Sequence, residues 1–277
     1  MEWRKLKNII ILILLLVNGF LLVLVGARWG ESRQYERSAL DGVVQVLENN
    51  GVRVERDAAA PAAALVPLTI ERDLDREAKL ARALLGEGME VDNRGGGLYL
   101  YRSGLGEVSI RPGGELSAEL SHDEWWHGEK PEALAIALLK DMGLDFQPAG
   151  VSEQGGRTTA RFRQLWDGVP VFSCEVEFVF EDGFLRTIQG TLLAAGQPGT
   201  EEGQVLDLPT ALLRFLDGVT ATGDVCTAVR AMVPGYRASS TPLSGSVRLT
   251  AAWLVSTDTA DYYLDGATGA LSRVPDR

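Results

Sequence analysis

The sequence has few residues of the two types that most often build compact chemical sites, cysteine and histidine. Its two cysteines, Cys174 and Cys226, are too few in 277 residues for a disulfide framework, so the core has to come from side-chain packing. We expect two free buried thiols, with one bridge as the alternative. Cys174 alternates with apolar neighbours in a pattern typical of a buried strand, which favours a core position over a nucleophile.

The only histidines, His122 and His127, would have to supply any histidine-based acid–base or metal chemistry. Residues five apart on a helix point about 140° away from each other, and the zinc-helix pattern His-Glu-x-x-His is absent. Nucleophile elbows, phosphate loops and dinucleotide fingerprints are absent as well. We therefore expect no catalytic residue, no metal and no cofactor, and a membrane-tethered hydrolase is the least favoured class.

Positive charge is also scarce, because 27 basic residues stand against 38 acidic ones and the net charge is −11. A chain of this charge is not expected to bind nucleic acid. It would be repelled by anionic lipid or cell-wall polymers unless divalent cations intervene.

What the sequence does contain is an apolar run, Ile9 to Val25, without a charge from residue 8 to residue 27. A helix of this length crosses the roughly 30 Å of a hydrocarbon core. Trp3 and Trp29 flank the run as membrane-interface anchors, and the basic residues before it favour a cytoplasmic N-terminus. We predict a single-pass cell-membrane protein, in contact with membrane lipid, with an extracytoplasmic remainder. The alternative is a cleaved signal peptide, since residues 25–27 end in small residues.

One polar residue, Asn18, lies in the middle of this run. An amide in the bilayer favours a hydrogen bond to another helix, and the neighbouring Gly19 permits close approach. Gly26 lies two turns further along the same stripe. We predict that Asn18, Gly19 and Gly26 form a partner-binding stripe, with an isolated, tolerated asparagine as the alternative.

Beyond the membrane the pattern alternates between one helix and several strands, three times in succession. Helices are predicted over 73–85, 131–142 and 209–216, the last with Asp207 as N-cap and Gly218 beyond its end. The strands that follow them are predicted over 89–91, 98–101 and 108–110, then 158–166, 169–180 and 184–193, then 247–257, 262–264 and 271–274. Helices that alternate with antiparallel meanders indicate an α+β ectodomain of duplicated modules, with helices packed on antiparallel sheets.

The predicted domain organisation follows from these patterns. Residues 1–8 form a cytoplasmic tail, 9–27 the transmembrane helix and 28–50 a stalk helix. A membrane-proximal α+β module covers 51–128, and a C-terminal α+β region covers 129–277.

Three groups of motifs resemble a known family. The start of the chain, with Met-Glu-Trp and then Asn-Gly-Phe-Leu-Leu at 18–22, is similar to that of YycI proteins. The strand–turn–strand sequence at 164–172 and the closing strands at 252–255, 262–265 and 267–271 also resemble that family, and they look like a PepSY-type module.

The resemblance implies a non-enzymatic, bitopic regulator of a sensor histidine kinase in a YycFG (WalKR) two-component system that controls cell-wall metabolism. Its partners would be that kinase and a YycH-like bitopic protein, contacted through transmembrane and extracytoplasmic surfaces. The alternative is a membrane-anchored extracytoplasmic binding or peptidase-inhibitor module of PepSY type, in which the apolar helix is only an anchor.

Overall fold

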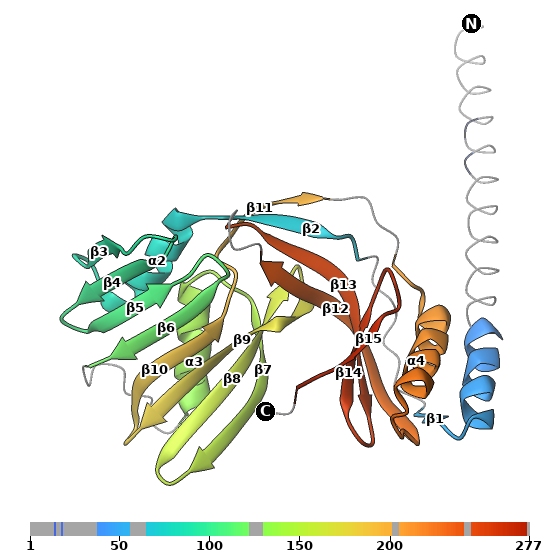
Figure 1. Ribbon diagram of the computed structural model, residues 1–277. Helices are drawn as coiled ribbons and strands as arrows, with labels where there is room; N and C mark the ends of the chain where they lie inside the picture. The colour runs from blue at the N-terminus through green and yellow to red at the C-terminus, as the bar shows by residue number, and fades with distance from the viewer. Residues whose placement is uncertain are drawn as a thin grey trace, which may run out of the picture.

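The computed structural model describes residues 14, 18, 38–55, 65–121, 130–200, 205–240 and 245–275. Within these residues, one fifteen-stranded sheet bends into two halves that meet where β9 pairs with β12 (Figure 1). Helices α2 and α3 pack on one half, and α4 packs on the other.

The elements repeat one order three times, a helix and then four strands. The first set is α2 (Leu74–Leu85), β3 (Glu90–Asn93), β4 (Tyr99–Ser103), β5 (Gly106–Ile110) and β6 (Glu115–Leu120). The second is α3 (Pro131–Asp141), β7 (Phe146–Gln154), β8 (Arg157–Trp166), β9 (Val169–Glu181) and β10 (Phe184–Thr191). The third is α4 (Leu208–Thr222), β12 (Ala228–Ser240), β13 (Val247–Thr257), β14 (Asp261–Asp265) and β15 (Leu271–Arg273). The predicted α+β class is confirmed.

Each set of strands is an antiparallel meander, and the first two meanders join where β10 pairs with β6. In the other half, β13 pairs with β12 along one side and with β14 and β2 (Leu68–Arg72) along the other. The strand β11 (Ala195–Thr200) extends that half beyond β2, and the short β1 (Arg53–Val54) runs parallel to β12. The two halves thus share one continuous set of hydrogen bonds.

Two predicted hairpin turns fix the register of the central meander. Asp167 and Gly168 have φ of 48° and 78°, and Asp182 and Gly183 have φ of 51° and 85°. Positive φ at both central residues is typical of the type I′ turn, whose twist matches that of the strands it joins. The Asp-Gly pairs therefore place β8, β9 and β10 side by side, as predicted.

Capping residues set both ends of α2 and the start of α4. Asp73 accepts hydrogen bonds from the N–H groups of Asp75 and Arg76, and α2 ends at Gly86. Asp207 caps α4 as predicted, but the predicted end before Gly218 is wrong, because α4 continues to Thr222. Gly218 is there for packing, since a Cβ at that position would lie 2.8 Å from the Cβ of Leu271 in β15.

The core has two main parts on opposite sides of the bend. Beneath α2 and α3, Phe162 and Phe178 meet edge to face with their ring centroids 5.7 Å apart. Beneath α4, Phe215 and Tyr262 meet at 5.8 Å around the buried Trp253. These packed faces lie on the outside of the bend and leave the opposite sheet faces turned inward.

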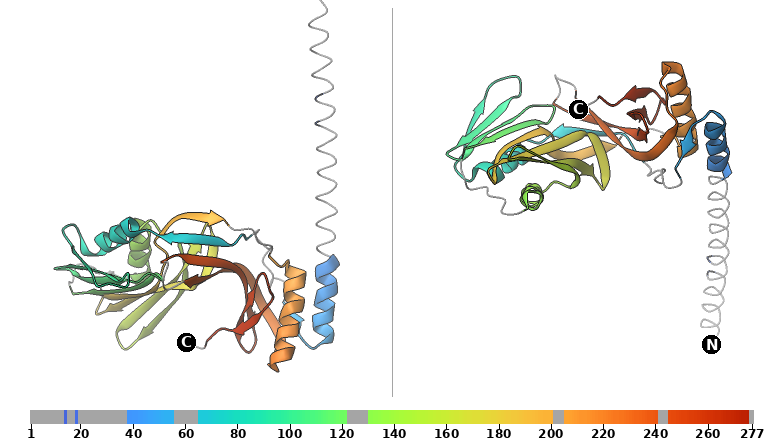
Figure 2. Two further views of the ribbon diagram at one scale, coloured as in Figure 1. Left: turned by 45° about the horizontal axis from the view of Figure 1, so that its top comes forward. Right: turned by 90° about the horizontal axis from the view of Figure 1, so that it is seen from below.

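Residues 38–49 are helical, in agreement with the described part of the predicted stalk, and this helix runs beside α4 (Figure 2). Its Val43 and Leu47 are buried in the same core as α4, and Leu47 is 0% exposed. The helix is therefore packed into the domain.

Several predictions concern positions outside the described residues. These positions are Trp3, Gly19, Gly26, Trp29, His122 and His127, most of residues 1–37, and the boundary between residues 128 and 129. No helix among the described residues is long and apolar enough to span a membrane. The transmembrane and localisation assignments stay predictions.

Candidate functional site

The predicted site residues that can be located do not gather at one place. Asn18 donates a hydrogen bond from its Nδ2 to the carbonyl of Leu14 at 2.9 Å, within its own helix. Cys174 and Cys226 are both free and buried. Burial raises the pKa of the Cys174 thiol to about 12, which suppresses the nucleophilic thiolate. No group of metal-binding side chains occurs in the described part of the chain.

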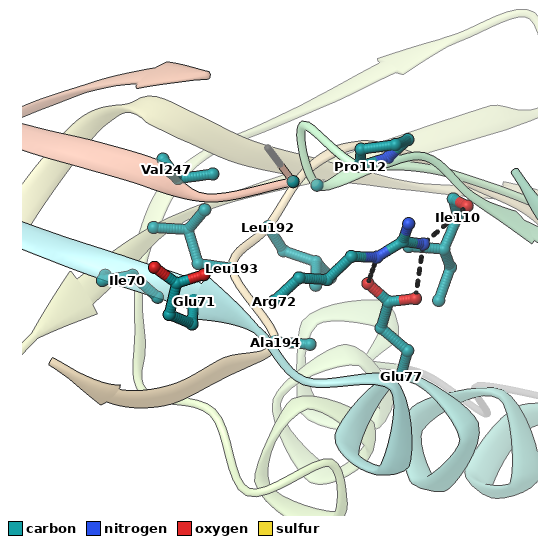
Figure 3. Close-up of a pocket in the computed structure, with 12 residues that line it drawn as sticks. Ile70, Glu71, Arg72, Glu77, Ile110, Pro112, Leu192, Leu193, Ala194 and Val247 are labelled. Carbon is teal, nitrogen blue, oxygen red and sulfur yellow. Dashed lines mark hydrogen bonds and ion pairs between the residues drawn. The ribbon is translucent and has the colours of Figure 1, made fainter. Parts of the chain in front are cut away.

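A small hollow lies where β2 meets α2 and the end of β5 (Figure 3). Its volume is about 20 Å³, which is room for about one water molecule. Arg72 and Glu77 point toward each other in it and form two hydrogen bonds of 2.6 and 2.8 Å. Arg72 also donates to the carbonyls of Gly97 and Ile110, at 2.6 and 3.3 Å. The charges and hydrogen-bond donors of Arg72 and Glu77 are thus satisfied within the protein. The pair connects β2 to α2 and to the end of β5, and we do not take this hollow as a binding site.

A larger cleft lies inside the bend, lined by residues of β7–β9 on one side and by residues of β13, β14 and the segment after β15 on the other. Its volume is about 360 Å³, within the usual range for ligand sites. The residues that line it are Ala149, Arg161, Arg163, Glu175, Leu254, Asp261, Tyr263, Val274 and Pro275. It is the candidate functional site.

An ion pair fixes one wall of the cleft. Arg163 of β8 and Glu175 of β9 are direct cross-strand partners, and the Nε of Arg163 donates to Glu175 Oε1 at 3.0 Å. The Nη2 of Arg163 donates to the same oxygen. The Glu175 side chain is only 8% exposed, so this pair is partly removed from water and holds both side chains in place.

Aromatic rings continue this wall across the bend. The rings of Phe172 and Tyr263 lie 5.8 Å apart, although they come from opposite halves of the sheet. The Arg163 guanidinium lies 5.8 Å from the centre of the Phe172 ring, and the Arg237 guanidinium lies 4.8 Å from that of Tyr263. The two rings therefore contact each other, and each also contacts a cation, so these side chains are held in place by the protein without a ligand.

Arg161 differs from its neighbours. Its Nε is buried and has no hydrogen-bond partner among the described residues. Glu177 lies directly opposite on β9, but the two form no ion pair, and Glu177 accepts a hydrogen bond from Gln189 at 3.3 Å. A buried donor without an acceptor is costly in a folded protein.

The local sequence explains why arginines face the cleft. In β8, Ala160 and Phe162 are buried in the core under the helices, so Arg161 and Arg163 point to the opposite face of the sheet. The alternation within 158–166 is visible in the sequence, but their partners are not, because those depend on the register with β9 and on the bend that brings in β14. The cleft therefore cannot be recognised from the sequence.

Comparison with known proteins gives a distant structural likeness. No protein-family model and no curated protein matches the chain. Among solved structures, the Bacillus megaterium YpeB C-terminal domain matches with a TM-score of 0.37 and 13% sequence identity, over 74% of this chain and 99% of that chain.

Proposed function

We propose that this chain is a membrane-anchored, extracytoplasmic binding module of PepSY-like type, and that it holds part of a partner protein in the cleft. The observation that carries the proposal is the ordered wall of the cleft. Arg163, Glu175 and Tyr263 are held in place by contacts with the protein itself, which reduces the entropy lost when a partner binds. Leu254, the direct cross-strand partner of Tyr263, adds an apolar contact beside it.

Regulation of a sensor histidine kinase is the second candidate. It is supported by the packing of residues 38–49, because Val43 and Leu47 attach this helix to the core under α4. A rigid connection of this kind would transmit binding in the cleft to the transmembrane helix predicted over residues 9–27. In that case the stripe of Asn18, Gly19 and Gly26 would contact the kinase or a YycH-like protein.

The test is affinity purification of the tagged full-length chain from membranes, with Leu254→Arg as the cleft variant. An arginine at this position should fill the cleft and prevent recovery of the partner. The matched control is Leu213→Arg, because Leu213 is 38% exposed on α4, away from the cleft. If Leu254→Arg recovers the same partner as the native chain at equal folded amounts, the cleft is not the binding surface.

A third version of the chain separates the two candidates. Replacing residues 9–25 with an unrelated apolar helix should leave cleft-dependent recovery intact if the helix is only an anchor. If a kinase is recovered with the native chain but not with this helix-swapped chain, in which Leu254 is unchanged, the result favours regulation of a sensor kinase.

A further inference from the structure

The unpartnered Arg161 says more about what enters the cleft, and this inference rests on the proposed function. Its side chain lines the cleft, and its Nε is buried without an acceptor in the described structure. Arg163, one step along the same face of β8, already has its acceptor in Glu175. The guanidinium of Arg163 is therefore neutralised by a carboxylate of the protein, whereas Arg161 forms no ion pair within the described part of the chain.

We propose that the cleft binds an extended segment of a partner protein through a single acidic side chain, whose carboxylate accepts hydrogen bonds from Arg161. A guanidinium and a carboxylate match in charge and in planar geometry, and such charge-assisted bonds are stronger than neutral ones. A carboxylate beside the cleft-facing Arg161 guanidinium would supply the anionic partner that Arg163 already has in Glu175.

The opposite wall limits how much negative charge the segment carries. Asp261 of β14 also lines the cleft. A second carboxylate beside Asp261 would be repelled. The cleft therefore favours one acidic residue flanked by neutral ones, and the apolar contacts from Leu254 and Val274 fit neutral neighbours.

The experiment compares two end-capped fluorescent octapeptides made of alanines and serines around one central residue. That residue is glutamate in one peptide and glutamine in the other, so the peptides differ only in a carboxylate or an amide. Binding to the full-length chain in lipid nanodiscs is measured by fluorescence anisotropy at low salt. We expect the glutamate peptide to bind about tenfold more tightly, the usual scale of one charge-assisted hydrogen bond. Selective arginine ¹⁵N labelling should show a shift of the Arg161 Nε–H signal with the glutamate peptide only.

Two variants of β8 form the matched test. Arg161→Gln should bind both peptides equally, whereas Arg157→Gln should keep the tenfold preference, because Arg157 is an exposed residue paired with Glu181 at 3.6 Å. Arg161→Lys retains the charge without the planar fork and should lose most of the preference, and it replaces Arg161→Gln if that variant does not fold. Asp261→Asn should strengthen binding of the glutamate peptide a few-fold, since it removes the like charge.

Equal affinity of the native chain for the two peptides would overturn the carboxylate proposal, and so would an unchanged preference in Arg161→Gln. Failure of both peptides to bind would overturn it too. None of these results bears on the Leu254-dependent recovery of a partner from membranes, so failure of this inference and failure of the proposed function are separate outcomes.

Discussion

Replacing Glu77 with alanine should destabilise the fold by about 3–4 kcal/mol. The Glu77 and Arg72 side chains are 4% and 13% exposed, and their two hydrogen bonds tie β2 to α2. Removing one partner of a buried pair leaves the other charge uncompensated, which typically costs about 3–5 kcal/mol. The residual exposure of Arg72 places the expected value in the lower part of that range.

The assay is urea unfolding of the full-length chain in detergent micelles, followed by tryptophan fluorescence. The midpoint should fall without a change in the slope m, and the thermal midpoint should fall by roughly 6–16 °C. A double variant, Arg72→Met with Glu77→Leu, should recover much of this loss, because it removes both charges. If Glu77→Ala costs less than about 1 kcal/mol, the reasoning that this pair holds β2 against α2 is wrong.

Three further predictions concern other parts of the molecule. Gly190→Ala should destabilise the fold by roughly 2 kcal/mol or more in the same urea assay. Gly190 has φ of 145°, and a Cβ there would lie 2.1 Å from the carbonyl oxygen of Glu175. A change below about 0.5 kcal/mol contradicts this. In a native-state iodoacetamide assay read by mass spectrometry, Cys174 should react only on unfolding, because it is 0% exposed and burial raises its pKa to about 12; prompt labelling of Cys174 contradicts this. Hydrogen bonds from the Thr227 hydroxyl and N–H hold the pKa of Asp258 below its ordinary value. The difference in unfolding free energy between the native chain and Asp258→Ala should therefore be constant above about pH 5 and shrink as the pH falls below about 4. A difference that grows in acid contradicts this.

Local signals in the sequence predict much of the fold. Asp73 and Gly86 mark the ends of α2, and the Asp-Gly pairs at 167–168 and 182–183 mark the central hairpins, because caps and tight turns depend on residues a few positions apart. The buried face of α2 is less well predicted. The apolar Leu74 is 41% exposed, whereas the charged Glu77 is buried because Arg72 meets it there.

Long-range contacts account for what the sequence does not indicate. The strand β12 is not predicted, because Pro234 and Gly235 interrupt its pattern. Gly235 is needed where β12 crosses β9, since a Cβ there would lie 2.5 Å from the ring of Phe172. This crossing makes the bend, and the bend makes the cleft, so the candidate site depends on an approach between residues far apart in the chain.

The central claim is that a partner binds inside the bend, and site-specific photo-crosslinking in living cells tests it most directly. A photoreactive phenylalanine analogue is placed at Ala149, an exposed residue that lines the cleft, or at Leu213 on the exposed face of α4, in the otherwise native full-length chain. We predict a discrete crosslinked partner from position 149 that is lost when Arg161→Gln is added, and none of that species from position 213. The same partner crosslinking equally from both positions, or only from position 213, would contradict the account.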